Sequence, residues 1–251
     1  MNTPTPPLQQ WLLAAVLGLA CASPLALAAP PIFEDSMAQR TLACTACHGQ
    51  QGRAASDGYY PRIAGKPAGY LYNQLLHFRH GQRQYGLMTR LIDPLSEPYL
   101  KEIAEYFAAL DLPYPPPQPS TASPAVLQRG EQLALRGDTA QRLPACMACH
   151  GARLTGVAPD VPGLLGLPRD YVNAQIGAWR TGQRTTRAPD CMHTVANRLS
   201  PDDVNAVASW LAAQPLPANT RPATAVPAPG TNALRCGSAP ALPGPLAKGA
   251  P

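Results

Sequence analysis

A five-residue motif, Cys-x-x-Cys-His, occurs twice in this 251-residue chain, at residues 44–48 and at residues 146–150. Two cysteines three positions apart on a helical turn point the same way, so both sulfur atoms can form thioethers with one porphyrin edge. The histidine that follows lies under the ring and can ligate its iron, which makes the motif the attachment signature of a c-type haem. We therefore predict two covalently bound haem c groups, held by Cys44, Cys47 and His48 and by Cys146, Cys149 and His150.

A redox-active dithiol and half of a zinc site are the alternatives for such a motif. A dithiol does not need the adjacent histidine, and zinc sites of this kind usually bring a second close pair of cysteines or histidines. Two copies of the motif in corresponding surroundings favour haem over both alternatives.

The sixth ligand of each iron, on the side opposite its histidine, also has to be identified. Methionine there raises the reduction potential and closes the iron to substrates, whereas an open position permits chemistry. Met88 and Met192 are the predicted ligands, because each half of the chain has one of them at an equivalent loop position. Methionines that merely fill gaps in a core are the alternative. At the second iron Cys191 and His193 are rival ligands, and a thiolate would lower the potential there.

Other residues are assigned by their relation to the motifs. Pro61 and Pro162 each follow their motif by about a dozen residues and are predicted to supply the carbonyl that orients the ligating histidine. His77 and His80 fall on a predicted helix and have no counterpart in the second half, so we assign both to a solvated helix face.

Cys191 and Cys236 are the cysteines left over when the leader and the two motifs are set aside. Two spare cysteines commonly pair in an oxidising compartment, and such a disulfide would pin the tail beside the second haem. Two independent thiols are the alternative.

The motifs belong to an internal repeat, which predicts the elements that hold them. In the first half we expect helices over residues 33–48, 70–80 and 96–110, and in the second half a haem-bearing helix over 124–149 followed by two counterparts. Apolar residues recur at helical spacing in each. Ser96 and Ser200 are predicted to cap the last helix of each half. Positions of the first half return 101 to 104 residues later: Pro61, Ile63 and Gly65 as Pro162, Leu164 and Gly166; Leu71, Gln74, Leu75, Phe78 and Gly81 as Val172, Gln175, Ile176, Trp179 and Gly182; Leu100, Ile103, Ala104 and Phe107 as Val204, Val207, Ala208 and Leu211.

Composition divides the chain into five segments. Residues 1–29 are predicted to be an export signal cleaved after residue 28 or 29, although no Lys or Arg precedes its apolar run. That run is short for a membrane span, and an uncleaved anchor or lipidation at Cys21 is the alternative. Two haem domains are expected at residues 30–112 and 125–215, a proline-rich linker at 113–124, and a tail at 216–251 that is mostly unstructured or draped on the surface.

Charge excludes one class of partner. The net charge is +5, but Lys and Arg are scattered along the chain, which argues against nucleic acid. Two domains of this size would each have a thin core, and covalently held haems would complete it.

Taken together, the repeated pattern resembles the dihaem cytochrome c4 family. The matching residues are Cys44–His48, Pro61–Gly65, Tyr70–Leu75, Gly81–Arg83, Met88 and Leu95–Ser96, and again Cys146–His150, Pro162–Gly166, Tyr171–Ile176, Gly182–Arg184, Met192 and Leu199–Ser200. The resemblance covers residues 33–214. It implies an all-α fold of two tandem class I cytochrome c domains, each with about three main helices around one covalent haem, facing each other with their propionate edges close.

The resemblance also implies a function. It predicts a periplasmic one-electron carrier that is not an enzyme and that exchanges electrons with a terminal oxidase, a bc1-type complex or a periplasmic dehydrogenase. It also allows peripheral membrane association. A dihaem oxidoreductase like thiosulfate dehydrogenase, with Cys191 on iron, is one alternative. A cytochrome subunit of a larger dehydrogenase is the other.

Overall fold

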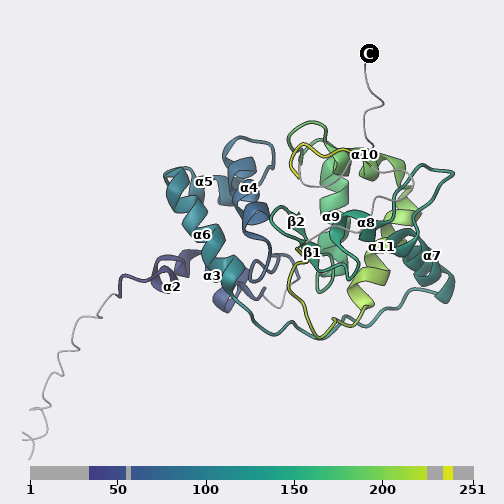
Figure 1. Ribbon diagram of the computed structural model, residues 1–251, viewed down its shortest axis with the longest axis horizontal. Coiled ribbons are helices and arrows are strands. Elements are labelled where there is room, and N and C mark those ends of the chain that lie inside the picture. The colour runs from purple at the N-terminus through teal and green to yellow at the C-terminus, as the bar shows by residue number, and fades with distance from the viewer. Residues whose placement is uncertain (1–33, 55–57, 225–233, 240–251) are drawn as a thin grey trace, which may run out of the picture. The chain divides into compact units, whose positions relative to one another are not determined.

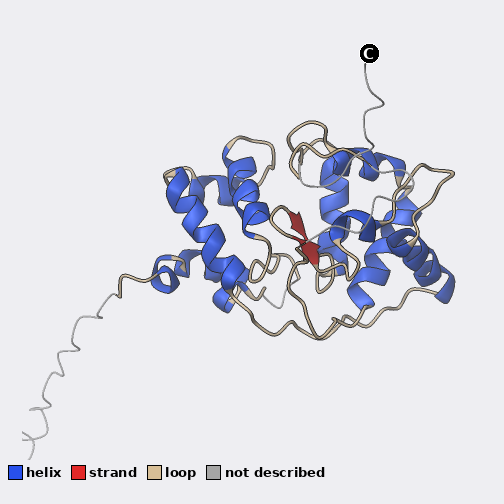
Figure 2. Ribbon diagram, in the orientation of Figure 1, coloured by secondary structure: helices blue, strands red, loops and turns tan. Residues whose placement is uncertain are grey.

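The computed structural model of the chain describes residues 34–54, 58–224 and 234–239. The expected export signal lies outside these residues. The chain divides into two units at Asp35 and Ser36, and all that follows concerns the second unit. Figure 2 shows that helices dominate it, with one small two-stranded sheet. None of the described helices has the length and apolar character that crossing a membrane requires.

The first repeat begins with a broken helix (Figure 1). A single helix was expected from Phe33 to His48, but Thr41 interrupts it, and its hydroxyl donates to the carbonyl of Met37 at 2.7 Å. A threonine that bonds back to the preceding turn competes with the helical hydrogen bonds, which explains the break. The elements are α2 (Met37–Arg40), α3 (Leu42–His48), the 3₁₀ turn η1 (Gln50–Gly52), α4 (Ala68–Arg79), α5 (Gly86–Ile92) and α6 (Glu97–Ala109).

The second repeat departs further from its expected start. The helix expected over residues 124–149 ends at Leu135, and a loop leads from it to the second motif. Gly137 turns the chain there with a φ of +72°, and a Cβ at this position would lie 2.4 Å from the Leu143 carbonyl oxygen. The elements are α7 (Pro124–Leu135), α8 (Cys146–His150), β1 (Gly156–Val157), β2 (Val161–Pro162), α9 (Arg169–Arg180), α10 (Cys191–Arg198) and α11 (Pro201–Ala213).

Each repeat has its own apolar core. In the first repeat α4 packs on α6, and the predicted stripe of α6 is buried as expected: Leu100, Ile103, Ala104 and Phe107. In the second repeat α7 and α9 pack on α11. The α7–α11 crossing is close because Gly130 carries no side chain, and a Cβ there would lie 2.2 Å from the Ala206 carbonyl oxygen. The last helix of each repeat starts at a serine cap, Ser96 and Ser200, as the sequence predicts.

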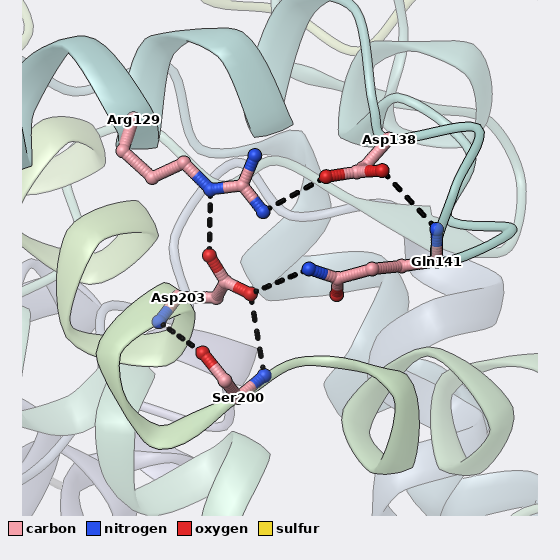
Figure 3. A network of polar contacts seen from close by, with 5 residues as sticks. All are labelled: Arg129, Asp138, Gln141, Ser200 and Asp203. Atoms are coloured by element: carbon pink, nitrogen blue, oxygen red, sulfur yellow. Dashed lines mark hydrogen bonds and ion pairs between the residues drawn. The ribbon is translucent and has the colours of Figure 1, made fainter.

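A polar network fixes the loop between α7 and α8 (Figure 3). Asp203 forms a capping box with Ser200 and accepts from Arg129 at 2.7 Å and from Gln141 at 3.2 Å. The Arg129 guanidinium also pairs with Asp138 at 2.9 Å. The network therefore ties the start of α11 to the loop that leads into the second Cys-x-x-Cys-His motif.

Two described segments of the tail pack against the second repeat. Ala223 pairs with β1 through two backbone hydrogen bonds, to Gly156 at 2.9 Å and from Ala158 at 2.8 Å. Further along, Cys236 and Ala239 are buried against Val157 and Val161 in a small cluster of their own. The described parts of the tail, residues 216–224 and 234–239, thus include segments packed on the second repeat, whereas residues 225–233 and 240–251 lie outside the described residues.

Candidate haem sites

The two motif histidines lie in matching environments. His48 Nδ1 lies 2.8 Å from the Pro61 carbonyl oxygen, and His150 Nδ1 lies 2.7 Å from that of Pro162. A carbonyl can only accept, so each Nδ1 carries the proton and each Nε2 keeps a free lone pair. Burial lowers the pKa of both imidazoles, which keeps them neutral. Both histidines are thus prepared to ligate a metal through Nε2, and the predicted carbonyl contacts are present.

The motif cysteines are partly buried on α3 and α8 beside their histidines. Burial raises the pKa of Cys44 and of Cys149, and burial together with the neighbouring Cys149 raises the pKa of Cys146 to about 12. These three thiols are therefore neutral before attachment. No disulfide joins them in the structure, so all four sulfurs are available for thioether bonds.

The two methionines sit on helices, which corrects the expected loops. Met88 is the third residue of α5, and Met192 is the second residue of α10. Each half-buried side chain lines the same cavity as the motif histidine of its own repeat. A short helix in each repeat thus presents a thioether sulfur to the cavity.

One continuous cavity of about 880 Å³ serves both motifs. Its walls come from both repeats, and they include His48, Met88, His150 and Met192. Most of the remaining lining is aliphatic or aromatic, such as the side chain of Phe107. An apolar space with a few polar groups is what a large planar macrocycle requires. Here the spaces beside the two motifs form one cavity.

Unpartnered donors in the cavity wall test whether haem fits. Trp179 Nε1 and Arg184 Nε are buried without a hydrogen-bond partner among the described residues, although both residues line the cavity. Buried polar groups in proteins are nearly always satisfied, so these donors call for acceptors that the protein does not supply. The carboxylates of haem are such acceptors, and the residues present fit the group.

His77 differs from its predicted role. Its side chain is only 6% exposed and lines the cavity, whereas His80 is exposed as expected. Burial, followed by the charges of Arg184 and Arg83, lowers the pKa of His77 to about 4. The residue is therefore a neutral cavity-wall group and not part of a solvated helix face.

Two arginines join the repeats. Arg83 donates to the Tyr171 hydroxyl at 3.0 Å and to Gln175 Oε1 at 2.8 Å, both in the other repeat. Arg184 in turn donates to Gln74 Oε1 of the first repeat at 2.9 Å. The backbones of the two arginines also form an antiparallel bridge. We call Arg83 and Arg184 the arginine pair; it is a symmetric link between the two haem sites.

Aromatic rings support the arginine pair from within each repeat. The Arg83 guanidinium lies 4.7 Å from the centroid of the Phe78 ring, and that of Arg184 lies 3.9 Å from the Trp179 ring. Arg83 and Arg184 are repeat partners in the sequence, but no role was predicted for them. Their occurrence at one offset in both halves was the available signal.

The rivals for the second iron are engaged elsewhere. Cys191 forms a disulfide with Cys236, their Cα atoms 5.1 Å apart, so the predicted pairing is confirmed. His193 points its Nδ1 at the Trp179 carbonyl at 3.1 Å, and its Nε2 contacts Asn197 at 3.2 Å. Met192 lines the cavity and takes part neither in the disulfide nor in the hydrogen bonds of His193.

Helical repeats around two Cys-x-x-Cys-His sites with preset histidines define a c-type cytochrome with two haem sites. A sequence profile of the family described as Cytochrome c matches residues 128–214. The thiosulfate dehydrogenase electron acceptor of Thiomonas intermedia is 40% identical over 212 residues, covering 84% of this chain and 93% of that protein. The cytochrome c4 of Pseudomonas aeruginosa is 32% identical over 174 residues, covering 68% of this chain and 84% of that protein.

Solved structures agree with these similarities. Reduced recombinant cytochrome c4 from Pseudomonas stutzeri matches 70% of this chain and 96% of its own, with a TM-score of 0.60 and 30% identity. A thiosulfate dehydrogenase from Marichromatium purpuratum matches 69% of this chain with a TM-score of 0.63 and 33% identity. This chain covers 36% of that protein, about a third of its length.

The chain therefore belongs to the dihaem cytochrome c4 family. It consists of two tandem class I cytochrome c domains, binds two haem c groups covalently and carries electrons to and from other redox proteins.

Proposed function

We propose that this chain is a periplasmic electron acceptor for a thiosulfate-oxidising dehydrogenase and that it passes electrons, one at a time, to a respiratory oxidase. Two relatives carry the name thiosulfate dehydrogenase electron acceptor, at 40% and 36% identity. The cytochromes c4 reported for comparison are 30–32% identical. The higher identity, over 93% of the Thiomonas protein, favours the sulfur-linked donor.

The observation that carries the electron-transfer role is the shared cavity. When bound, each haem c supplies one iron that alternates between the ferrous and ferric states. The protein holds both sites in one largely apolar cavity, and the arginine pair joins its walls. A continuous low-dielectric space between two sites favours transfer inside the chain, so that one site can receive an electron and the other deliver it.

The proposal includes the ligands and the segment boundaries. Met88 and Met192 supply the sixth ligands, because each lines the cavity with the histidine of its own repeat. The domains are residues 30–112 and 125–215, joined by the linker at 113–124. The leader is a cleaved export signal, consistent with haem attachment and a disulfide, both of which belong outside the bacterial cytoplasm.

A dihaem enzyme with a thiolate on its second iron is the competing function. It requires Cys191 as a thiolate, and the disulfide to Cys236 removes that thiolate. We accordingly propose that the chain has no thiosulfate-oxidising activity of its own. The same sites are also compatible with a permanent subunit of a larger dehydrogenase. The match to about a third of the Marichromatium thiosulfate dehydrogenase favours close association of this chain with such an enzyme.

Stopped-flow reduction tests the proposal. The oxidised dihaem protein is mixed with thiosulfate alone, with a thiosulfate dehydrogenase alone, and with both. We expect rapid reduction of both haems only in the complete mixture, with cytochrome c4 from Pseudomonas aeruginosa as the slower comparison protein. Reduction by thiosulfate alone would favour the enzyme. If this chain is reduced no faster than the Pseudomonas aeruginosa cytochrome c4, the proposal of a thiosulfate-oxidising donor is wrong.

A further inference from the structure

Lys66 is a buried cation that none of the functions above uses. Its side chain is 5% exposed and lines the shared cavity. It lies in the first repeat, in the turn between Pro61 and α4, and its Nζ donates to the carbonyl of Gly163 in the second repeat at 3.1 Å. None of the ion pairs formed by the described residues includes it. Lysine is almost never buried without a partner, so the site is unusual.

The contact places this charge against the histidine side of the second haem site. Gly163 directly follows Pro162, whose carbonyl oxygen accepts from His150 Nδ1 at 2.7 Å. One peptide unit thus separates the carbonyl held by Lys66 from the carbonyl held by the ligating histidine. The ammonium group belongs to the first repeat in sequence but contacts the second site.

The first haem site has no lysine at the equivalent position. The repeat partner of Lys66, 101 positions later, is Leu167, which is half-buried and packs against the core of the second repeat. Leucine can neither donate a hydrogen bond nor carry charge. At this position the second site therefore has a charge that the first site lacks, whereas the arginine pair contributes one guanidinium from each repeat. Arg62, which directly follows Pro61, is the buried cation beside the first site.

Nearby groups leave this charge in place. Burial, followed by the neighbouring Arg62, lowers the pKa of Lys66 to about 8, so the ammonium form still predominates at neutral pH. The Arg62 guanidinium itself is directed elsewhere, to the carbonyls of Leu112 and Pro113, and stacks 3.9 Å from the Tyr114 ring centroid.

We propose that Lys66 sets the potentials of the two haems apart: its buried charge raises the reduction potential of the second haem above that of the first. A ferric centre carries one more positive charge than a ferrous one, so a nearby cation destabilises the oxidised form more. The interaction is strong where water is excluded. An electron that enters at the first site then moves downhill: the first iron goes from ferrous to ferric as the second goes from ferric to ferrous. This direction of transfer does not depend on which dehydrogenase is the donor.

A redox titration of the dihaem protein tests the proposal. The haem methyl resonances are assigned to each site by their NMR contacts with residues of each repeat, and each potential is then measured separately. Lys66→Gln keeps a donor for the Gly163 carbonyl but removes the charge, Lys66→Met removes both, and Lys66→Arg keeps the charge. Lys101→Gln removes a lysine that is 62% exposed on α6 and is the matched control.

We expect Lys66→Gln and Lys66→Met to lower the second potential selectively and to shrink or invert the gap between the haems, with haem content and visible spectra unchanged. Lys66→Arg and Lys101→Gln should leave the gap intact. The proposal is overturned if Lys66→Gln leaves the gap unchanged, or if the first haem shifts as much as the second. If Lys66→Met does not fold, Lys66→Gln alone still decides, because it retains the hydrogen bond.

Discussion

Cys236 in the tail is covalently bonded to Cys191, the residue that begins α10 and directly precedes Met192. The bond spans 45 residues of sequence and holds the segment 234–239 against the wall of the second haem site, where Leu234, Ser238 and Ala239 line the cavity. Gly237 adds a backbone hydrogen bond to the Pro189 carbonyl at 2.9 Å. The segment 234–239 is thus a covalently held part of the wall of the second haem site.

The disulfide predicts a thiol titration. In the folded, oxidised protein neither Cys191 nor Cys236 should react with a thiol reagent, and two thiols should appear after denaturation and reduction. Cys236→Ser should reduce the free energy of unfolding by about 2–4 kcal/mol, because the denatured chain loses its cross-link. Two thiols that titrate freely in the folded, oxidised protein would contradict the disulfide.

Replacing the proposed ligand of the first iron should open one site only. In Met88→Ala we expect the first haem to lose its thioether ligand and its reduction potential to fall. Carbon monoxide should then bind to only one of the two reduced haems of each chain. Visible spectra and a redox titration measure the effect. Met37→Ala, a methionine of the same repeat that packs against the core, is the control and should bind no carbon monoxide. A Met88→Ala protein with the parental spectrum and potential would exclude Met88 as the ligand.

The arginine pair should stabilise the contact between the repeats. Arg184→Gln removes the guanidinium donors to Gln175 at 2.8 Å and to Gln74 at 2.9 Å, so each amide oxygen keeps only its bond from Arg83. The expected cost is about 1–3 kcal/mol in the free energy of unfolding. Guanidinium denaturation followed by circular dichroism measures it, and Arg180→Gln, an exposed arginine at the end of α9, is the matched control. Equal stability of the two variants would refute this role.

Asp203 should make stability depend on acid pH. Burial alone would raise the pKa of its carboxyl, but hydrogen bonds from Arg129, Gln141 and Ser200 outweigh burial and hold it below its usual value. A lowered pKa contributes stability that is complete above the unfolded value, about 3.9, and is lost as the pH falls through the folded value. Asp203→Asn should cost on the order of 2 kcal/mol at neutral pH.

Thermal unfolding between pH 7 and pH 3 measures this effect. The Asp203→Asn protein should lose less stability than the parent on acidification, because the linked proton uptake is gone. Asp202→Asn removes the exposed neighbouring carboxylate and should follow the parent curve. A parental acid profile in Asp203→Asn would show that this carboxylate is not the linked group.

The sequence alone determined what depends on short spacing. Two cysteines and a histidine within five residues establish each attachment site, and the serines at 96 and 200 mark the start of the last helices because a cap acts on the turn that it begins. The repeat offset then identified Met88 and Met192 as equivalent residues. All of this information is local or periodic, so it can be read without coordinates.

Only the tertiary structure decided what depends on contacts between the repeats. His77 is buried in the cavity wall, where the charge of Arg184 from the second repeat acts on it, and the helical pattern of its own neighbourhood does not contain that fact. Lys66 meets Gly163 across 97 residues of sequence. Burial and hydrogen bonds at such separations arise from packing between repeats, so the environment of Lys66 could not be predicted from the residues around it in the sequence.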